Sequence, residues 1–139
     1  MNQCRISNVK RLRGRGECVP MKTKLLIVDD QAGIRLLLTD IFIHEGYDVT
    51  TAQTGKEALD KIIEHPFDLV LLDYNLPVLN GLQVIKQMEK RAITVPVVLM
   101  SGLIDNVKEE LGSSRTTIQT VAKPFNIKDI RELVKGTVT

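Results

Sequence analysis

The chain has 139 residues, of which 43% are hydrophobic and 26% are charged, so we expect one globular domain with a substantial core. No apolar run approaches the roughly 18 residues of a membrane span, which excludes a membrane protein and predicts a soluble one. The net charge of +2 is unevenly distributed, because residues 1–20 hold five Lys/Arg and one acid (+4) and the remainder holds fourteen and sixteen (−2). The mildly acidic remainder argues against direct DNA binding.

Residues 1–20 have no apolar periodicity and contain the basic run Lys10–Gly16 and both cysteines, Cys4 and Cys18. No disulfide can therefore link the domain core, which suits a reducing cytoplasm. The segment also lacks the apolar region of a secretory signal. One interpretation is an arm for nucleic acid or a membrane surface. We favour a basic, disordered leader over 1–20 and a domain over 21–139, because Met21 opens the patterned region.

The patterned region begins with a compact apolar run, Leu25–Val28, typical of a buried strand. Apolar residues at helical spacing follow and predict an amphipathic helix that ends at Gly46. Residues 47–51 are polar and alternating, which predicts an edge strand. The apolar series of this helix is Ile34, Leu37, Leu38, Ile41 and Phe42.

A capping box at Thr54–Glu57 predicts a second helix that ends at His65-Pro66. The apolar run 69–72 then predicts a central buried strand that ends on Asp73. Asn80-Gly81 starts a third helix. The remaining predicted elements are a strand at 97–100, a short helix around Ile104, Val107 and Leu111, a strand at 118–122, and a last helix capped by Asn126.

This alternation predicts an α/β fold, a flavodoxin-like (βα)5 doubly wound parallel sheet of five strands with helices on both faces. Residues capable of chemistry follow every predicted strand except the second. In the strand order 2-1-3-4-5 those four strand ends lie side by side, where ligands bind in such folds. The residues are Asp29, Asp30, Asp73, Ser101 and Lys123.

Three acids in one cleft repel one another and need a cation, and Mg²⁺ prefers such hard oxygen ligands together with phosphate. A metal-bound carboxylate can attack phosphorus and form an aspartyl phosphate. Lys123 could neutralise phosphoryl oxygens, and Ser101 offers a hydroxyl donor. The set therefore predicts phosphoryl transfer. Each residue alone could instead cap a helix, form a turn or pair with a surface charge.

Four short motifs follow one another in order, and together they resemble the receiver domain of two-component response regulators. The resemblance covers about Lys22 to Gly136. The first and last helices are similar to single-domain regulators of the sporulation type, which are relay proteins without an output domain. The motifs are Ile27-Val28-Asp29-Asp30, Leu71-Leu72-Asp73 with Pro77 and Gly81, Met100-Ser101-Gly102, and Lys123-Pro124-Phe125.

The resemblance implies a signalling protein of the cytoplasm that catalyses its own aspartyl phosphorylation and slow dephosphorylation. The phosphoryl group would come from a phosphohistidine in a Mg²⁺-dependent reaction. The implied partners are a sensor histidine kinase and a histidine phosphotransfer protein, and the implied state is a monomer. Two roles stay open: a relay intermediate, and a stand-alone regulator that binds a target when phosphorylated.

The resemblance also implies roles for individual residues. Asp73 would be the phosphoacceptor, and Ser101 and Lys123 would contact the phosphoryl group as the other catalytic residues. Asp29 would act on the metal largely through water, and Asn75 through its backbone carbonyl. The Lys123–Pro124 peptide bond is commonly cis in the family. The expected metal ligands are Asp29, Asp30, Asp73 and Asn75.

We expect partners to dock on a rim around the acidic cleft. An ordinary core position for Ile34 stays open, because it starts the apolar series of its helix. One departure from the family is Thr120, which occupies a position where receivers often carry Tyr or Phe as a switch, so the usual signalling route is in doubt. The expected docking residues are Gln31, Ile34, Arg35, Pro124 and Phe125.

Other classes fit the sequence less well. A phosphatase with an aspartyl nucleophile needs a second acid two residues after Asp73, where Asn75 lies. In a flavodoxin, the acidic pair after the first strand would repel the flavin phosphate. A degenerate receiver that only binds would have lost Asp73 or Lys123, and both are present.

Overall fold

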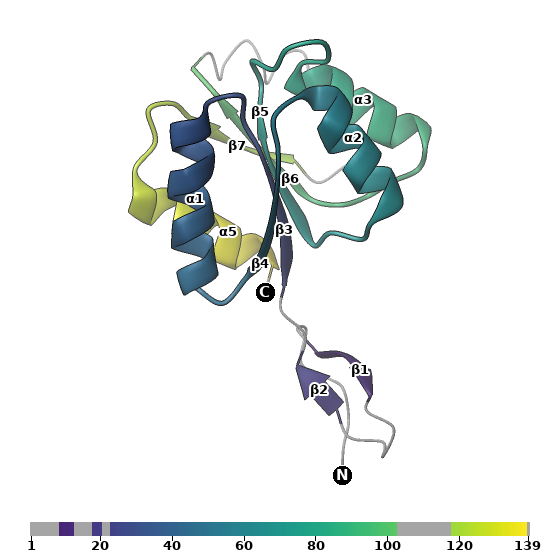
Figure 1. The fold of residues 1–139 in the computed structure, drawn as a ribbon, viewed down its shortest axis with the longest axis vertical. Coiled ribbons are helices and arrows are strands. Elements are labelled where there is room, and N and C mark those ends of the chain that lie inside the picture. The colour runs from purple at the N-terminus through teal and green to yellow at the C-terminus, as the bar shows by residue number, and fades with distance from the viewer. Residues whose placement is uncertain (1–8, 13–17, 21–22, 103–117, 139) are drawn as a thin grey trace.

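The computed structural model describes residues 9–12, 18–20, 23–102 and 118–138. Its centre is a five-stranded sheet in which neighbouring strands are parallel, in the order β4-β3-β5-β6-β7 (Figure 1). When strands β3 to β7 are numbered 1 to 5, this is the predicted order 2-1-3-4-5, so the doubly wound α/β fold is confirmed. The strands are β3 (Lys24–Val28), β4 (Asp48–Ala52), β5 (Leu69–Asp73), β6 (Val97–Ser101) and β7 (Ile118–Ala122).

Burial explains the position of each strand in the sheet. Every residue of β5 and β6 is buried, as expected for strands covered on both faces. Only Ala52 of β4 is buried, which confirms the polar strand as an edge.

In the part of the chain that the structure describes, two helices cover each face of the sheet (Figure 1). The α1 and α5 side chains pack over alternate residues of β3 and β5, such as Leu25 and Leu71. The α2 and α3 side chains pack over the intervening residues, such as Leu26 and Leu72. The described helices are α1 (Ala32–His44), α2 (Gly55–Glu64), α3 (Gly81–Lys90) and α5 (Ile127–Val138). The helix predicted around Ile104, Val107 and Leu111 lies outside the described residues.

The predicted caps start three of these helices. Asn80 forms a complete capping box with Gln83 at the start of α3, and Asn126 accepts a hydrogen bond from the backbone N–H of Lys128. The box predicted at Thr54–Glu57 forms only in half. Thr54 accepts from the N–H of Glu57 (3.0 Å), but the Glu57 carboxylate accepts from the N–H of Gln53 instead. The N–H groups of Glu57 and Gln53 are therefore both satisfied at this helix start.

The apolar face predicted for α1 is too wide. Leu38 and Phe42 are fully buried, but Leu37 is 42% exposed. Because each residue turns an α-helix by about 100°, Leu37 lies at the edge of the series and away from its buried centre. Leu36 and Ile43 are also exposed, at 71% and 53%. The end of the helix is as predicted, with Gly46 at φ +94°.

Within the predicted leader, the structure describes two short strands, β1 (Val9–Leu12) and β2 (Cys18–Pro20), which pair antiparallel. The sequence pattern did not predict this pairing. In Figure 1 the pair lies apart from the five-stranded sheet. The domain boundary at residue 21 stays a prediction. In the described part of the chain, no helix has the length and apolar character of a membrane span.

Candidate functional site

The register of the sheet places the chemically capable residues along one edge. Val28 of β3 pairs with Leu72 of β5, so the residues that follow them, Asp29 and Asp73, come side by side. Ser101 pairs with Ala122, so Lys123 follows at the adjacent strand end. The carboxyl ends of four neighbouring strands therefore meet, where parallel α/β sheets carry their sites.

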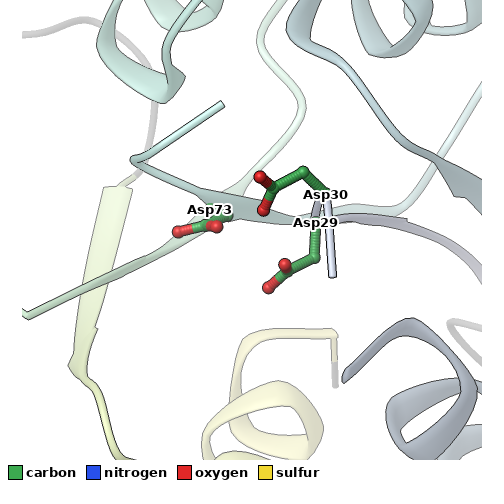
Figure 2. Close-up of side chains that lie close together, drawn as sticks. All are labelled: Asp29, Asp30 and Asp73. Atoms are coloured by element: carbon green, nitrogen blue, oxygen red, sulfur yellow. The ribbon is translucent and has the colours of Figure 1, made fainter. Parts of the chain in front are cut away.

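Three carboxylates gather at this edge. Ligand oxygens of Asp29, Asp30 and Asp73 all lie within 4.8 Å of one another. Figure 2 shows Asp29 and Asp30 leaving consecutive positions of the chain beside Asp73. Asp29 is 0% exposed and Asp73 is 3% exposed, whereas Asp30 is exposed to solvent. The cluster therefore consists of two buried carboxylates and one carboxylate that faces solvent.

The ammonium group of Lys123 bridges the two buried acids. Its Nζ lies 3.0 Å from Oδ2 of Asp29 and 3.2 Å from Oδ1 of Asp73. The backbone holds this lysine in place, because its N–H donates to the carbonyl oxygen of Ser101 (2.9 Å). The Lys123–Pro124 peptide bond that follows is cis. Burial alone would lower the pKa of Lys123, but the hydrogen bonds and charges of Asp29 and Asp73 outweigh it and raise the pKa.

The electrostatics of Asp73 oppose its ionised form. Burial raises the pKa of this carboxyl above its usual 3.8, and the charge of Asp29 raises it further. Lys123 and the N–H of Asn75, which donates to Oδ1 (3.3 Å), act in the opposite direction without cancelling the rise. Added positive charge beside Asp73 would therefore lower its pKa and stabilise the carboxylate.

Two backbone contacts hold the other wall of the site. The N–H of Gln31 donates to Oδ1 of Asp29 (2.9 Å). Arg35 donates from Nη1 to the backbone carbonyl oxygen of Asp29 (2.7 Å). Sequence reasoning placed Arg35 only on a docking rim and missed this contact. The signal in the sequence is weak, since the spacing of six residues spans a turn and the start of a helix.

The loop after Asp73 is packed tightly. A Cβ atom on Gly81 would lie 2.7 Å from the carbonyl oxygen of Asp73, so only glycine allows α3 to start this close to the cluster.

The same loop contains a tight turn, in which the N–H of Leu79 donates to the carbonyl oxygen of Pro77 (2.8 Å). Val78 between them has φ +71° and is 80% exposed, which makes a γ-turn centred on a β-branched residue.

Ser101 is 2% exposed and ends β6, the strand next to that of Asp73. Thr120, in the position of the family's aromatic switch, is half-buried in the middle of β7 and pairs with Leu99. Asn75 is exposed directly after the turn from β5. The structure thus brings the predicted catalytic residues to one edge of the sheet.

The predicted docking residues flank this edge from two segments, the start of α1 and the residues after β7. Gln31 and Pro124 are exposed. Ile34 and Phe125 are half-buried, and both pack against the core under α1 and α5. Arg35 is half-buried and contacts Asp29 as described. The rim is therefore mixed, with Ile34 contributing to the core as well as to the surface. The role of this rim in docking stays a prediction.

The residues fit a hard divalent cation. Three carboxylates converge within 4.8 Å, and the pKa of Asp73 is raised, by burial first and then by the charge of Asp29, although Lys123 acts to lower it. Mg²⁺ binds through one or two carboxylates and retains several waters, which the exposed side of the cluster allows. The donor set contains no sulfur or imidazole, so it does not favour zinc.

Comparisons with known proteins agree with the fold. Residues 25–135 match the family model of the response regulator receiver domain. The chain is 41% identical over 119 residues to sporulation initiation phosphotransferase F of Bacillus subtilis, covering 83% of this chain and 93% of that protein. It spans about half the length of some other curated relatives, 48% and 52% in two cases.

Solved structures show the same similarity. The receiver domain of Francisella response regulator 1452 has a TM-score of 0.77 and 31% identity, covering 84% of this chain and 97% of that chain. Response regulator TrrA of Thermotoga maritima, solved in complex with Mg²⁺-BeF, has a TM-score of 0.72 and 33% identity over 83% and 98%. The resemblance drawn from the motifs is confirmed, and this chain belongs to the response regulator receiver domain family.

Proposed function

We propose that Asp73 is the phosphoacceptor of this receiver and that it takes its phosphoryl group from a phosphohistidine. One observation carries the assignment. Asp73 is the acid of the cluster that ends β5, bridged through Lys123 to Asp29 and with Asp30 within 4.8 Å. A carboxylate of this kind is a nucleophile once positive charge favours its ionised form.

The transfer of the phosphoryl group needs no reactant besides the phosphohistidine and Asp73. A carboxylate oxygen of Asp73 attacks phosphorus, the bond from phosphorus to the imidazole nitrogen breaks, and the histidine keeps the electron pair. Lys123 lies 3.2 Å from Oδ1 of Asp73, so its ammonium can move onto a phosphoryl oxygen as that oxygen approaches. The hydroxyl of Ser101, at the neighbouring strand end, donates to another phosphoryl oxygen.

Mg²⁺ is the proposed cofactor, and it would supply charge neutralisation between the carboxylates and the phosphoryl oxygens. Asp30 and Asp73 would hold it directly, Asp29 largely through water, and Asn75 through its backbone carbonyl. The converging carboxylates support this site. The similar TrrA structure, which was solved with Mg²⁺-BeF, supports it as well.

The proposed partners are a sensor histidine kinase and a histidine phosphotransfer protein, met in the cytoplasm. Similarity to a protein named as a phosphotransferase over 93% of its length favours a relay role over a stand-alone regulator. We place the docking rim at Gln31, Ile34, Arg35, Pro124 and Phe125, which flank the cluster from two segments. The readout of phosphorylation would pass through a residue other than Thr120.

The direct test is labelling of the purified protein with radioactive acetyl phosphate in the presence of Mg²⁺. Wild type should take up label that hydroxylamine removes, as expected for an acyl phosphate. Asp73→Asn keeps the shape of the side chain but has no carboxylate, so it should fold and remain unlabelled. Asp68→Asn, directly before the same strand, is the matched control and should label normally. Label that persists in Asp73→Asn would place the phosphoryl group elsewhere.

A further inference from the structure

The three carboxylates of the cluster are anchored unequally. The side chain of Asp29 is held by Lys123 and by the N–H of Gln31, at 3.0 and 2.9 Å. Asp73 is held by the same lysine and by the N–H of Asn75. Among the described residues, the exposed carboxylate of Asp30 has no such hydrogen bond or ion pair. Its location therefore depends on the backbone that carries it.

Arg35 holds that backbone. Its Nη1 donates to the carbonyl oxygen of Asp29 at 2.7 Å, and this carbonyl belongs to the peptide group that joins Asp29 to Asp30. A peptide group is planar, so fixing its oxygen fixes its orientation and the direction in which the Asp30 side chain leaves the chain. On the other side, the N–H of Asp29 donates to the carbonyl oxygen of Ala52. The Asp29–Asp30 turn is thus tied to β4 and to α1.

We propose that Arg35 is a positioning residue for the metal site: it orients the Asp29–Asp30 peptide so that the carboxylate of Asp30 points into the cluster. This inference rests on the proposed function, since it takes the cluster to be a Mg²⁺ site. It gives Arg35 a task in metal binding in addition to its place on the docking rim. Mutation of a residue that orients a metal ligand typically weakens the affinity for the metal by about 10- to 100-fold.

The sign of the effect distinguishes this role from two simpler ones. If Arg35 acts only as a positive charge near the cluster, its removal makes the site more negative and Mg²⁺ binds more tightly. If Arg35 acts only in docking, Mg²⁺ affinity does not change. If it orients Asp30, Mg²⁺ binds more weakly although the repelling charge has gone.

The experiment measures Mg²⁺ affinity by titration calorimetry of the full chain, with no phosphoryl donor present. Arg35→Met keeps most of the aliphatic stem and removes every donor, and it should weaken binding about tenfold. Arg35→Lys keeps the charge on a side chain one bond shorter and should lie between Arg35→Met and wild type. Lys128→Met removes one exposed positive charge from the first turn of α5 and should bind Mg²⁺ as wild type does.

A double-mutant cycle tests whether Arg35 acts through Asp30. Asp30→Ala alone should weaken Mg²⁺ binding, and adding Arg35→Met to it should weaken binding by less than twofold. In acetyl phosphate labelling, Arg35→Met should need about tenfold more Mg²⁺ for half-maximal rate and should approach the wild-type rate at saturation. A merely structural role would lower the rate at all Mg²⁺ concentrations and would add its full effect to that of Asp30→Ala.

Unchanged or tighter Mg²⁺ binding by Arg35→Met overturns the inference, as does a full additive loss in the cycle. If Arg35→Met does not fold, the Arg35→Lys variant decides: wild-type affinity there overturns the inference, and weakened affinity supports it. Failure of the proposed function is a separate result, because then wild type itself would neither bind Mg²⁺ nor label.

Discussion

Gly81 offers a sensitive test of how closely α3 packs against Asp73 and the loop that follows it. A Cβ atom at this position would lie 2.7 Å from the carbonyl oxygen of Asp73 and 2.8 Å from Cδ1 of Leu99. Ordinary contacts begin at 3.4 Å, so in Gly81→Ala the new Cβ atom and the carbonyl oxygen must move apart by about 0.7 Å (3.4 − 2.7). Since the first obstacle is backbone, the start of α3 or the end of β5 must move.

The expected free energy follows from two opposing effects. Replacing glycine by alanine in a helix favours folding by about 1 kcal/mol. Overpacking against a closely packed site costs about 1–3 kcal/mol. Gly81→Ala should therefore lower the free energy of unfolding by up to about 2 kcal/mol, which corresponds to a fall in Tm of up to about 8 °C. It should also slow acetyl phosphate labelling, because the strain falls on the backbone of Asp73.

Gly33→Ala is the matched control, because Gly33 lies in the first turn of α1 with no atom within 4 Å of a new Cβ. It should raise the free energy of unfolding by about 0.5–1 kcal/mol. Urea unfolding followed by circular dichroism measures both variants without Mg²⁺, and labelling follows in parallel. If Gly81→Ala proved as stable as Gly33→Ala, the close approach of α3 to Asp73 would be refuted.

Three further predictions concern single side chains. Because the folded-state pKa of Asp73 is raised, its ionisation lowers stability as the pH rises from its unfolded value of 3.8 through its folded value. Asp73→Asn should therefore gain stability relative to wild type as the pH rises above about 4 in metal-free urea titrations, and a constant difference would contradict the raised pKa. Val78→Asn should raise the free energy of unfolding by about 1 kcal/mol, since Asn adopts positive φ more readily than Val. A less stable variant in the same titration would argue against strain at this γ-turn. Ile34→Ala should slow transfer from a phosphohistidine donor much more than labelling by acetyl phosphate. Equal loss in both assays, with a lower Tm, would assign Ile34 to the core alone.

The fold could be predicted because its strands and helices are marked by apolar residues that recur in a regular pattern along the chain. The apolar runs of β3, β5 and β6 end on chemically capable residues, and the polar strand Asp48–Ala52 falls at the edge. Since parallel strands share one carboxyl edge, the gathering of Asp29, Asp73 and Lys123 follows from topology alone. The family motifs were a second and independent source for the same residues.

Contacts that depend on the path of one turn could not be predicted in this way. The hydrogen bond from Arg35 to the Asp29 carbonyl depends on the angle at which α1 leaves β3. The helical period placed Leu37 among the core residues, because a period does not show where the buried stripe ends. The positive φ of Val78 was missed because β-branched residues seldom adopt it.

The bridging position of Lys123 has a consequence for the energetics of phosphorylation. With all groups ionised, the three acids and the lysine sum to −2. A phosphoryl group of about −2 charge in place of the Asp73 carboxylate would change the sum to about −3. The phosphorylated cluster should therefore bind Mg²⁺ more tightly than the unmodified one. By thermodynamic linkage, Mg²⁺ then favours the phosphorylated protein by the same factor. A chelator added to the transfer reaction would thus shift its equilibrium back toward the histidine donor, besides slowing it.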